Sequence, residues 1–120
     1  MKKSRKSLVK AADKAMSRYI IARDMRCVQC GSTTNLTNGH LFSRVAYSTR
    51  WDDTACYCQC KNCNLRHEYD PYPFTKVFLD IHGQAWVDDL HSRWSKPLKL
   101  KDYQIEEIAK YYTKKAEALS

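Results

Sequence analysis

Apolar residues recur at helical spacing near the start of the chain. Between residues 4 and 26 they return every third or fourth position, which is typical of one buried helix face. These positions are Leu8, Val9, Ala12, Ala15, Met16, Tyr19 and Ile20. The opposite face carries a basic stripe, made of Lys3, Lys10, Lys14 and Arg18. We therefore expect residues 1–26 to form a basic N-terminal helix, whose stripe either contacts DNA phosphates or is a solvated face.

Helical spacing returns after residue 73. One apolar run contains Phe74, Val77, Phe78 and Ile81, and a second contains Trp86, Val87, Leu90 and Trp94. His82-Gly83 between them is typical of a helix stop, because glycine readily takes the left-handed conformation. Pro97 breaks the chain, and Asp102 is a candidate cap for a last helix carrying Ile105, Ile108, Ala109, Tyr112 and Leu119. Residues 74–120 are thus predicted to form a C-terminal helical region.

The segment between these helical regions, residues 27–73, has a different character. Glycine, asparagine, serine and threonine are frequent in its first half, which predicts turns and short strands arranged as a hairpin. The pattern as a whole predicts one compact α+β domain, in which this central segment lies between an N-terminal helix and C-terminal helices.

Composition narrows the class of protein. The 120 residues include 21 Lys and Arg but only 13 Asp and Glu, so the net charge of +8 favours a polyanionic partner such as DNA. Apolar residues make up 43% of the chain, enough for a folded core, but no apolar stretch approaches the roughly 20 residues that span a bilayer. Charges interrupt residues 1–16 too often for a secretion signal. We expect a soluble, cytoplasmic protein without a membrane partner.

Cysteine spacing indicates a metal site. Cys27 and Cys30 form one Cys-x-x-Cys pair, and Cys60 and Cys63 form a second. Reduced thiolates at this spacing can surround Zn²⁺ tetrahedrally, and the metal then stabilises a segment too small for its own apolar core. The sequence therefore predicts one structural zinc ion. Residues 31–59, between the pairs, are longer than a zinc ribbon needs, so we expect a functional insert.

The other two cysteines, Cys56 and Cys58, alternate with Cys60 along a predicted strand. They share one strand face with it, and either could replace an assumed zinc ligand. We interpret both as buried thiols.

Nitrogen and oxygen donors lie in and just beyond the insert. His40 follows Asn38-Gly39 inside it, and Asn64 and His67 are one helical turn apart after the second cysteine pair. Such donors suit Mg²⁺ or another divalent ion better than thiolates do. A second, catalytic metal position beside the zinc is therefore expected.

These motifs resemble a known family. They are Cys27-x-x-Cys30, Gly39-His40-Leu-Phe-Ser-Arg44, Arg50-Trp51-Asp52 and Gln59-Cys60-x-x-Cys63-Asn64. In this order they are similar to the phage NinG (Rap) recombination endonucleases, zinc-stapled relatives of the HNH, or ββα-metal, nucleases. The resemblance covers about residues 25–119 and includes Ile81-His82-Gly83 and Val87-Asp88-Asp89-Leu90.

The resemblance implies a treble-clef/ββα-metal core and an HNH-like DNA endonuclease. His40 falls at the position of the general base, and Asn64 and His67 at the metal-binding helix, where they would hold Mg²⁺ or Mn²⁺. Two positions depart from the HNH pattern: Ala55 stands where an asparagine is expected, and Gly39 where an aspartate is expected. One metal ligand is then missing, for which Asn38, Glu68 and Asp70 are the candidates.

The implied reaction is hydrolysis of branched DNA, such as Holliday junctions or D-loops, to products with a 5′ phosphate and a 3′ hydroxyl. The guanidinium of Arg44 or Arg50 could clamp a neighbouring phosphate. A junction cut on two strands favours a homodimer, for which Trp86, Trp94, Tyr111 and Tyr112 could supply the interface, although Trp86 fits the core better. Two alternatives remain open: a non-catalytic zinc-dependent DNA-binding protein, and an RNA-binding or protein-interaction zinc domain.

Overall fold

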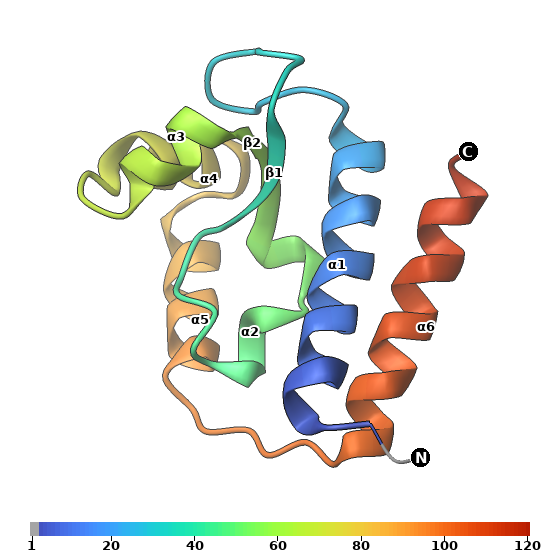
Figure 1. Cartoon of the computed structure of the whole chain (residues 1–120). Helices are drawn as coiled ribbons and strands as arrows, with labels where there is room; N and C mark the ends of the chain where they lie inside the picture. The colour runs from blue at the N-terminus through green and yellow to red at the C-terminus, as the bar shows by residue number, and fades with distance from the viewer. Residues whose placement is uncertain (1–2) are drawn as a thin grey trace.

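A computed structural model describes residues 3–120 as six α-helices and one antiparallel hairpin (Figure 1). The helices are α1 (Arg5–Asp24), α2 (Tyr47–Arg50), α3 (Lys61–His67), α4 (Tyr72–His82), α5 (Gln84–Trp94) and α6 (Asp102–Ala118). The strands are β1 (Leu36–His40) and β2 (Cys56–Cys60), and a 3-10 turn at Asp53–Ala55 precedes β2. The α+β class expected from the sequence is confirmed.

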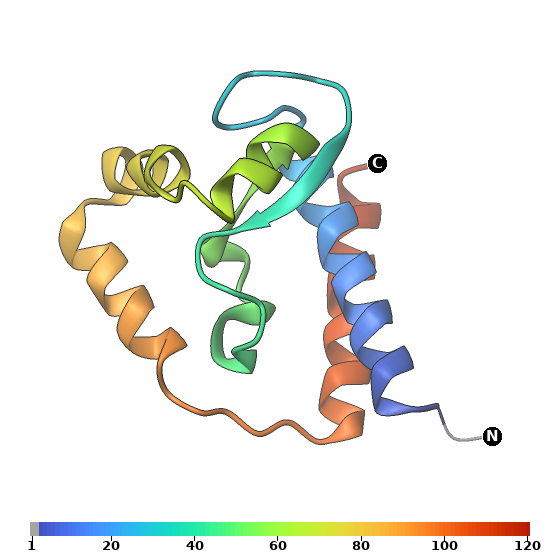
Figure 2. The same cartoon turned by 60° about the vertical axis from the view of Figure 1, so that its left-hand side comes forward.

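The two long helices lie side by side at one flank of the molecule. Helices α1 and α6 run in the same direction, as Figures 1 and 2 show from two sides. Arg5 and Asp102, at their first turns, form a 3.0 Å ion pair. Leu8, Ala12, Met16 and Ile20 are the buried residues of α1, and Ile105, Tyr112 and Ala116 are those of α6. The expected helix over residues 4–26 is therefore confirmed, and its apolar stripe is the buried face.

The hairpin forms the centre of the molecule. Its register pairs Leu36 with Cys60 and His40 with Cys56, so His40 lies at the end of β1 that leads into residues 41–55. Helix α3 follows β2 directly, and the Sγ of Cys60 caps it by accepting the Cys63 N–H. Helix α3 thus starts beside the beginning of β1, and its last residue, His67, reaches the Leu41 carbonyl just after the end of β1.

Helices α4 and α5 meet at a corner beside the hairpin. Gly83 ends α4 and begins α5 with a φ of 88°, which confirms the predicted glycine stop. Trp86 is half-buried and stacks on His82 with ring centroids 3.8 Å apart. Among the aromatic residues considered for a dimer interface, Tyr112 is a core residue, whereas Tyr111 is 54% exposed.

One expected helix cap is wrong. Lys101 is the N-cap residue of α6, and its N–H donates to the Gln104 side chain at 2.8 Å. Asp102 is already inside the first helical turn, where its carboxylate pairs with Arg5. Across the part of the chain that is described, no helix is both long and apolar enough to cross a membrane.

Candidate metal centre and histidine cleft

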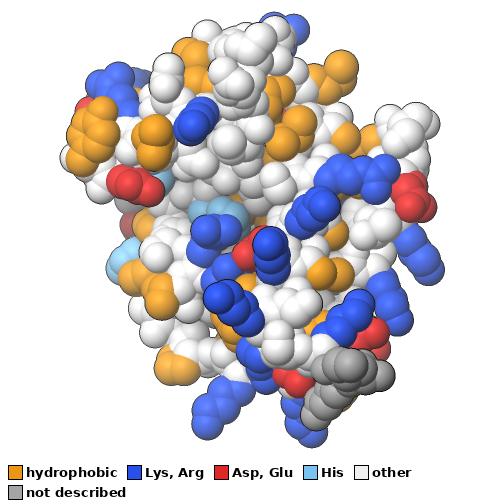
Figure 3. All heavy atoms as spheres, viewed as in Figure 1, with side chains coloured by type: hydrophobic (Ala, Val, Ile, Leu, Met, Phe, Trp, Pro, Cys, Tyr) orange, Lys and Arg blue, Asp and Glu red, His pale blue; other side chains and the backbone are white. Residues whose placement is uncertain are grey.

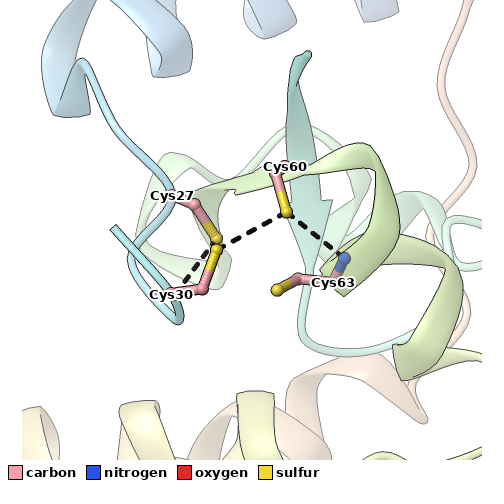
Figure 4. A group of neighbouring side chains, drawn as sticks. All are labelled: Cys27, Cys30, Cys60 and Cys63. Atoms are coloured by element: carbon pink, nitrogen blue, oxygen red, sulfur yellow. Dashed lines mark hydrogen bonds between the residues drawn. The ribbon is translucent and has the colours of Figure 1, made fainter. Parts of the chain in front are cut away.

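Four cysteines converge at one end of the hairpin (Figure 4). Cys27 and Cys30 come from the turn after α1, Cys60 ends β2, and Cys63 lies in the first turn of α3. Their sulfur atoms all lie within 4.8 Å of one another. Within residues 3–120 they are the only group of three or more Cys, His, Asp or Glu side chains that could share an ion.

The geometry of this cysteine cluster fits zinc. A tetrahedral ion with Zn–S bonds of about 2.3 Å separates its sulfur ligands by roughly 3.8 Å. The Cys30 and Cys60 sulfurs are 3.7 Å apart. In each pair the first sulfur accepts the N–H of the second residue, at 3.4 Å for Cys27 and 3.5 Å for Cys60. The four residues predicted as zinc ligands could therefore hold a metal ion, as a structural zinc site requires.

Position, rather than thiol ionisation, separates the cluster from the other two cysteines, because burial also raises the pKa of Cys63 within the cluster. Burial opposes charge on Cys27, but backbone N–H groups directed at its sulfur lower its pKa to about 7. Burial raises the pKa of Cys58 to about 11 and that of Cys56 well above its ordinary value. Neither belongs to the four-sulfur group, so both are buried thiols, as the sequence predicted.

A cleft of about 810 Å³ opens beside the hairpin and contains both candidate histidines. Helix α1 contributes Asp13 to its wall, and β1 contributes His40. Arg44 comes from the segment after β1, and α3 contributes Asn64 and His67. The structure therefore brings the predicted base, the predicted metal ligands and both predicted phosphate clamps, Arg44 and Arg50, to the walls of a single cavity.

His40 is held in one tautomer. Its Nε2 lies 2.8 Å from the backbone carbonyl of Arg50, and since a carbonyl only accepts, Nε2 carries the proton. Nδ1 then has a free lone pair, with no hydrogen-bond partner in the described chain. Burial lowers the pKa of His40 to about 4, so the ring is neutral at physiological pH. A neutral imidazole with a free Nδ1 can accept a proton.

His67 shows the same arrangement on α3. Its Nε2–H donates to the Leu41 carbonyl at 2.8 Å. Its Nδ1 is buried and, among residues 3–120, has no hydrogen-bond partner. Asn64 donates its side-chain N–H to the Thr37 hydroxyl at 2.9 Å, which leaves its Oδ1 as an acceptor. A buried nitrogen lone pair without a partner is costly in a folded protein. The same lone pair is what a histidine ligand donates to a divalent ion.

Apart from the cysteine cluster, no group of three or more Cys, His, Asp or Glu side chains in the described residues lies close enough together to share an ion, so no such set surrounds this second position. Of the three candidate substitutes, Asp70 pairs with Arg66 at 3.0 Å, and Glu68 lines the cleft as an exposed side chain. Asn38 also lines the cleft, and its Oδ1 is buried without a partner. Gly39 cannot be replaced by a ligand, because a Cβ there would lie 2.1 Å from the Gln59 Oε1.

The two candidate phosphate clamps, Arg50 and Arg44, differ in how freely their guanidinium groups could contact a ligand. The Arg50 side chain is 16% exposed, and it donates from Nε at 3.0 Å and from Nη2 at 2.6 Å to the two carboxylate oxygens of Asp13. Arg44 is 57% exposed and lies 3.5 Å from the same carboxylate. Arg50 is therefore engaged within the protein, while Arg44 can reach a ligand. The sequence analysis did not identify Asp13. The feature that could have pointed to it is an acidic residue at the edge of an otherwise basic helix face.

Basic side chains lie along α1 at the edge of the cleft. Lys3, just before the helix, and Lys10, Lys14 and Arg18 within it are all exposed. At about 100° per residue Lys14 is a neighbour of the cleft residues Asp13 and Ser17. Figure 3 shows Lys and Arg side chains gathered over this helix.

Comparison with known proteins agrees with the motifs. Residues 1–120 match the family described as Bacteriophage Lambda NinG protein. Protein ninG of Salmonella phage P22 is 28% identical over 103 residues, which cover 78% of this chain and 51% of that relative. The chain thus spans about half the length of this curated relative. No solved structure matches it. Because the family match extends over the complete sequence, including both cysteine pairs and the cleft residues, the chain belongs to the phage NinG family.

Proposed function

We propose that this chain is a metal-dependent DNA endonuclease that acts on branched recombination intermediates such as Holliday junctions or D-loops. The observation that carries the proposal is His40, a neutral histidine in a cleft, with Nε2–H pinned to a carbonyl and Nδ1 free. General bases require this combination of fixed orientation and an unoccupied lone pair. The net charge of +8 and the exposed stripe on α1 supply the attraction for DNA.

The order of elements supports a treble-clef/ββα-metal relationship. A Cys-x-x-Cys turn precedes the hairpin, a second Cys-x-x-Cys joins β2 to α3, and the base and the helix donors face one cleft. In this proposal zinc holds the hairpin and α3 together, and the reaction takes place at the other end of the hairpin, beside His40.

Each chemical requirement of phosphodiester hydrolysis has a residue in the cleft. His40 accepts the proton of the attacking water at Nδ1, and Arg44 binds a phosphate oxygen through its guanidinium. The His67 Nδ1 and the Asn64 Oδ1 would hold Mg²⁺ or Mn²⁺, which would supply positive charge to neutralise the phosphate and the leaving oxygen. Arg50 is excluded from the clamp, because its guanidinium is paired with Asp13.

A non-catalytic zinc-dependent DNA-binding protein is the alternative. The lack, within residues 3–120, of a second group of three Cys, His, Asp or Glu side chains that could share an ion favours it, because Mg²⁺ prefers several oxygen ligands. The two proposals agree on the zinc and on DNA binding and differ only in cleavage.

Substitution of His40 separates them. Purified protein is incubated with linear, forked and four-way DNA in Mg²⁺ or Mn²⁺, and strand cleavage and binding are measured together. His40→Ala should lower cleavage of branched DNA by roughly 10²- to 10⁴-fold, the effect typical of losing a positioned base, while affinity stays within a few fold. His67→Ala should also lose cleavage, but excess Mn²⁺ should restore part of it, since that variant weakens ion binding rather than removing the base.

The matched control is His91→Gln, which changes an exposed histidine that does not line the cleft. It should cleave like wild type. Wild-type protein that binds branched DNA and cuts it with neither ion would contradict the endonuclease and support the binding protein.

A further inference from the structure

The residue that fixes His40 belongs to a segment without regular strand or long helix. The acceptor for the His40 Nε2–H is the backbone carbonyl of Arg50, within residues 41–55, which connect β1 to β2. In this segment Ala55 carries no polar side chain, and only its backbone bonds: its N–H donates to the Asp52 carbonyl, and its carbonyl accepts the Leu41 N–H. The orientation of the histidine ring therefore depends on whatever holds Arg50 in place.

Asp13 of α1 holds Arg50 and the next residue at the same time. Its Oδ1 accepts from the Arg50 Nε and from the Trp51 indole N–H, each at 3.0 Å. Its Oδ2 accepts from the Arg50 Nη2 at 2.6 Å. The remaining terminal nitrogen of Arg50, Nη1, donates to the Arg44 carbonyl at 2.9 Å. One carboxylate and one guanidinium thus join α1, α2 and the segment after β1.

We infer that Asp13 is the positioning residue for His40, acting through Arg50. The two-point contact between carboxylate and guanidinium fixes the Arg50 side chain, and the neighbouring carbonyl of the same residue then holds the histidine Nε2–H. Asp13 lies on the wall of the cleft but makes no bond to His40, so its effect passes through the orientation of residue 50. This inference rests on the proposed nuclease function only where it concerns cleavage.

Burial makes the pair suited to this role. The side chains of Arg50 and Asp13 are 16% and 21% exposed, so their contact is shielded from salt more than a surface ion pair is. Breaking such a pair leaves a poorly solvated guanidinium, which draws the backbone around it toward water. By contrast, the Arg5–Asp102 pair also links α1 to another element but is 46% and 35% exposed.

The test compares Asp13→Asn with the control Asp102→Asn, which makes the same chemical change in the more exposed Arg5–Asp102 pair. Zinc-loaded protein is labelled with ¹⁵N-histidine, and the tautomer of His40 and the hydrogen exchange of its Nε2–H are read by NMR. In wild type and in Asp102→Asn we expect one tautomer, protonated at Nε2, with a slowly exchanging proton. Asp13→Asn should give averaged tautomers and at least about tenfold faster exchange, as expected of a ring that has lost its fixed acceptor.

The same variants are then assayed on branched DNA. Asp13→Asn should reduce kcat by roughly tenfold to a hundredfold while binding stays within a few fold, because misplacing a reacting group affects the chemical step. Asp13→Glu, which keeps the charge, should recover part of both the NMR signature and kcat. If wild type cuts no DNA, the NMR comparison still tests the positioning of His40.

Folded Asp13→Asn with the wild-type tautomer and exchange rate would overturn the inference, whatever the cleavage result. If Asp13→Asn does not fold, Arg50→Lys provides the test, since it keeps the positive charge and the backbone carbonyl but loses the two-point contact. An unchanged His40 signature in that variant would likewise overturn the inference.

Discussion

The histidine at the end of β1 combines two properties that oppose each other. Burial lowers its pKa to about 4, which keeps the ring neutral and able to accept a proton, but a base of low pKa accepts that proton weakly. In the proposed reaction, the fixed orientation from the Arg50 carbonyl would compensate for weak basicity, because a positioned base needs no reorganisation. The same burial also makes His40 sensitive to acid.

Protein stability should therefore depend on His40 below neutral pH. The pKa of His40 is about 4 in the folded protein and about 6.5 in an unfolded chain, so between these values the unfolded state binds more protons. The contribution is complete above pH 6.5 and is lost as the pH falls toward 4. Urea unfolding should give a free-energy decrease from pH 7.5 to 5.0 that is up to about 2 kcal/mol larger in wild type than in His40→Gln.

Comparing wild type with His40→Gln cancels the contributions of the other acid-sensitive groups to the pH dependence of stability, because the zinc thiolates and the remaining histidines contribute equally in both proteins. An equal pH dependence in wild type and His40→Gln would show that His40 is solvated like an ordinary surface histidine.

Single residues also show where sequence reasoning ends. The four-cysteine site could be predicted from the sequence, because the geometry of a bound metal ion determines the spacing within each cysteine pair. Gly39, in contrast, looked only like a missing aspartate, and the structure explains it by the Gln59 side chain packed against its Cα. Asp13 was missed because its partners lie 37 and 38 residues further along the chain, beyond any local pattern.

At the scale of elements, the helices were predicted more completely than their arrangement. Periodicity located α1, α4, α5 and α6 because each buries one stripe. It did not indicate that α1 and α6 are parallel, since that depends on which faces meet after residues 95–101 cross the molecule. The short helix α2 was also not predicted, because four residues contain too little periodic signal.

The basic stripe of α1 is the element that should bind the DNA backbone. Replacing Lys10, Lys14 and Arg18 by Gln should reduce the slope of log K against log salt by roughly 2 to 3, because each phosphate contact contributes about 0.9. The control replaces Lys76, Lys96 and Lys99, which are equally exposed but belong to α4 and the segment after α5. Fluorescence anisotropy with a labelled junction measures both slopes.

The control variant should change the slope by about one or less, since it alters only the general field of the protein. Equal slopes for the two triple variants would mean that the stripe is a solvated face and that DNA binds elsewhere.

For the molecule as a whole, the zinc site should determine whether the central segment folds. Cys60 ends β2 and caps α3, so loss of this ligand affects the hairpin and the helix of Asn64 and His67 together. Cys60→Ser should lose the bound zinc and its cooperative thermal transition, since zinc binding by four thiolates is worth roughly 10 kcal/mol or more. Mass spectrometry of the native protein and circular dichroism measure the two effects.

Cys58→Ala is the matched control, because it removes a buried cysteine of the same strand that is outside the four-sulfur group. It should retain one zinc per chain. A Cys60→Ser protein with one tightly bound zinc and a wild-type transition would disprove the four-cysteine site.

The parallel pairing of α1 with α6 has a consequence for synthesis on the ribosome. Residues 5–24 emerge early and residues 102–118 late, yet their contact is the most extensive between any two elements described. The part of the α1 surface that packs on α6 therefore stays uncovered until residues 102–118 have been made, and loop closure over such a separation is slow. Since Asp13 belongs to α1, the helix that forms this wall of the cleft completes its packing only when α6 has docked. Assembly of the cleft should thus be completed only after α6 has been made, and a nascent chain that lacks α6 is a natural client for chaperones.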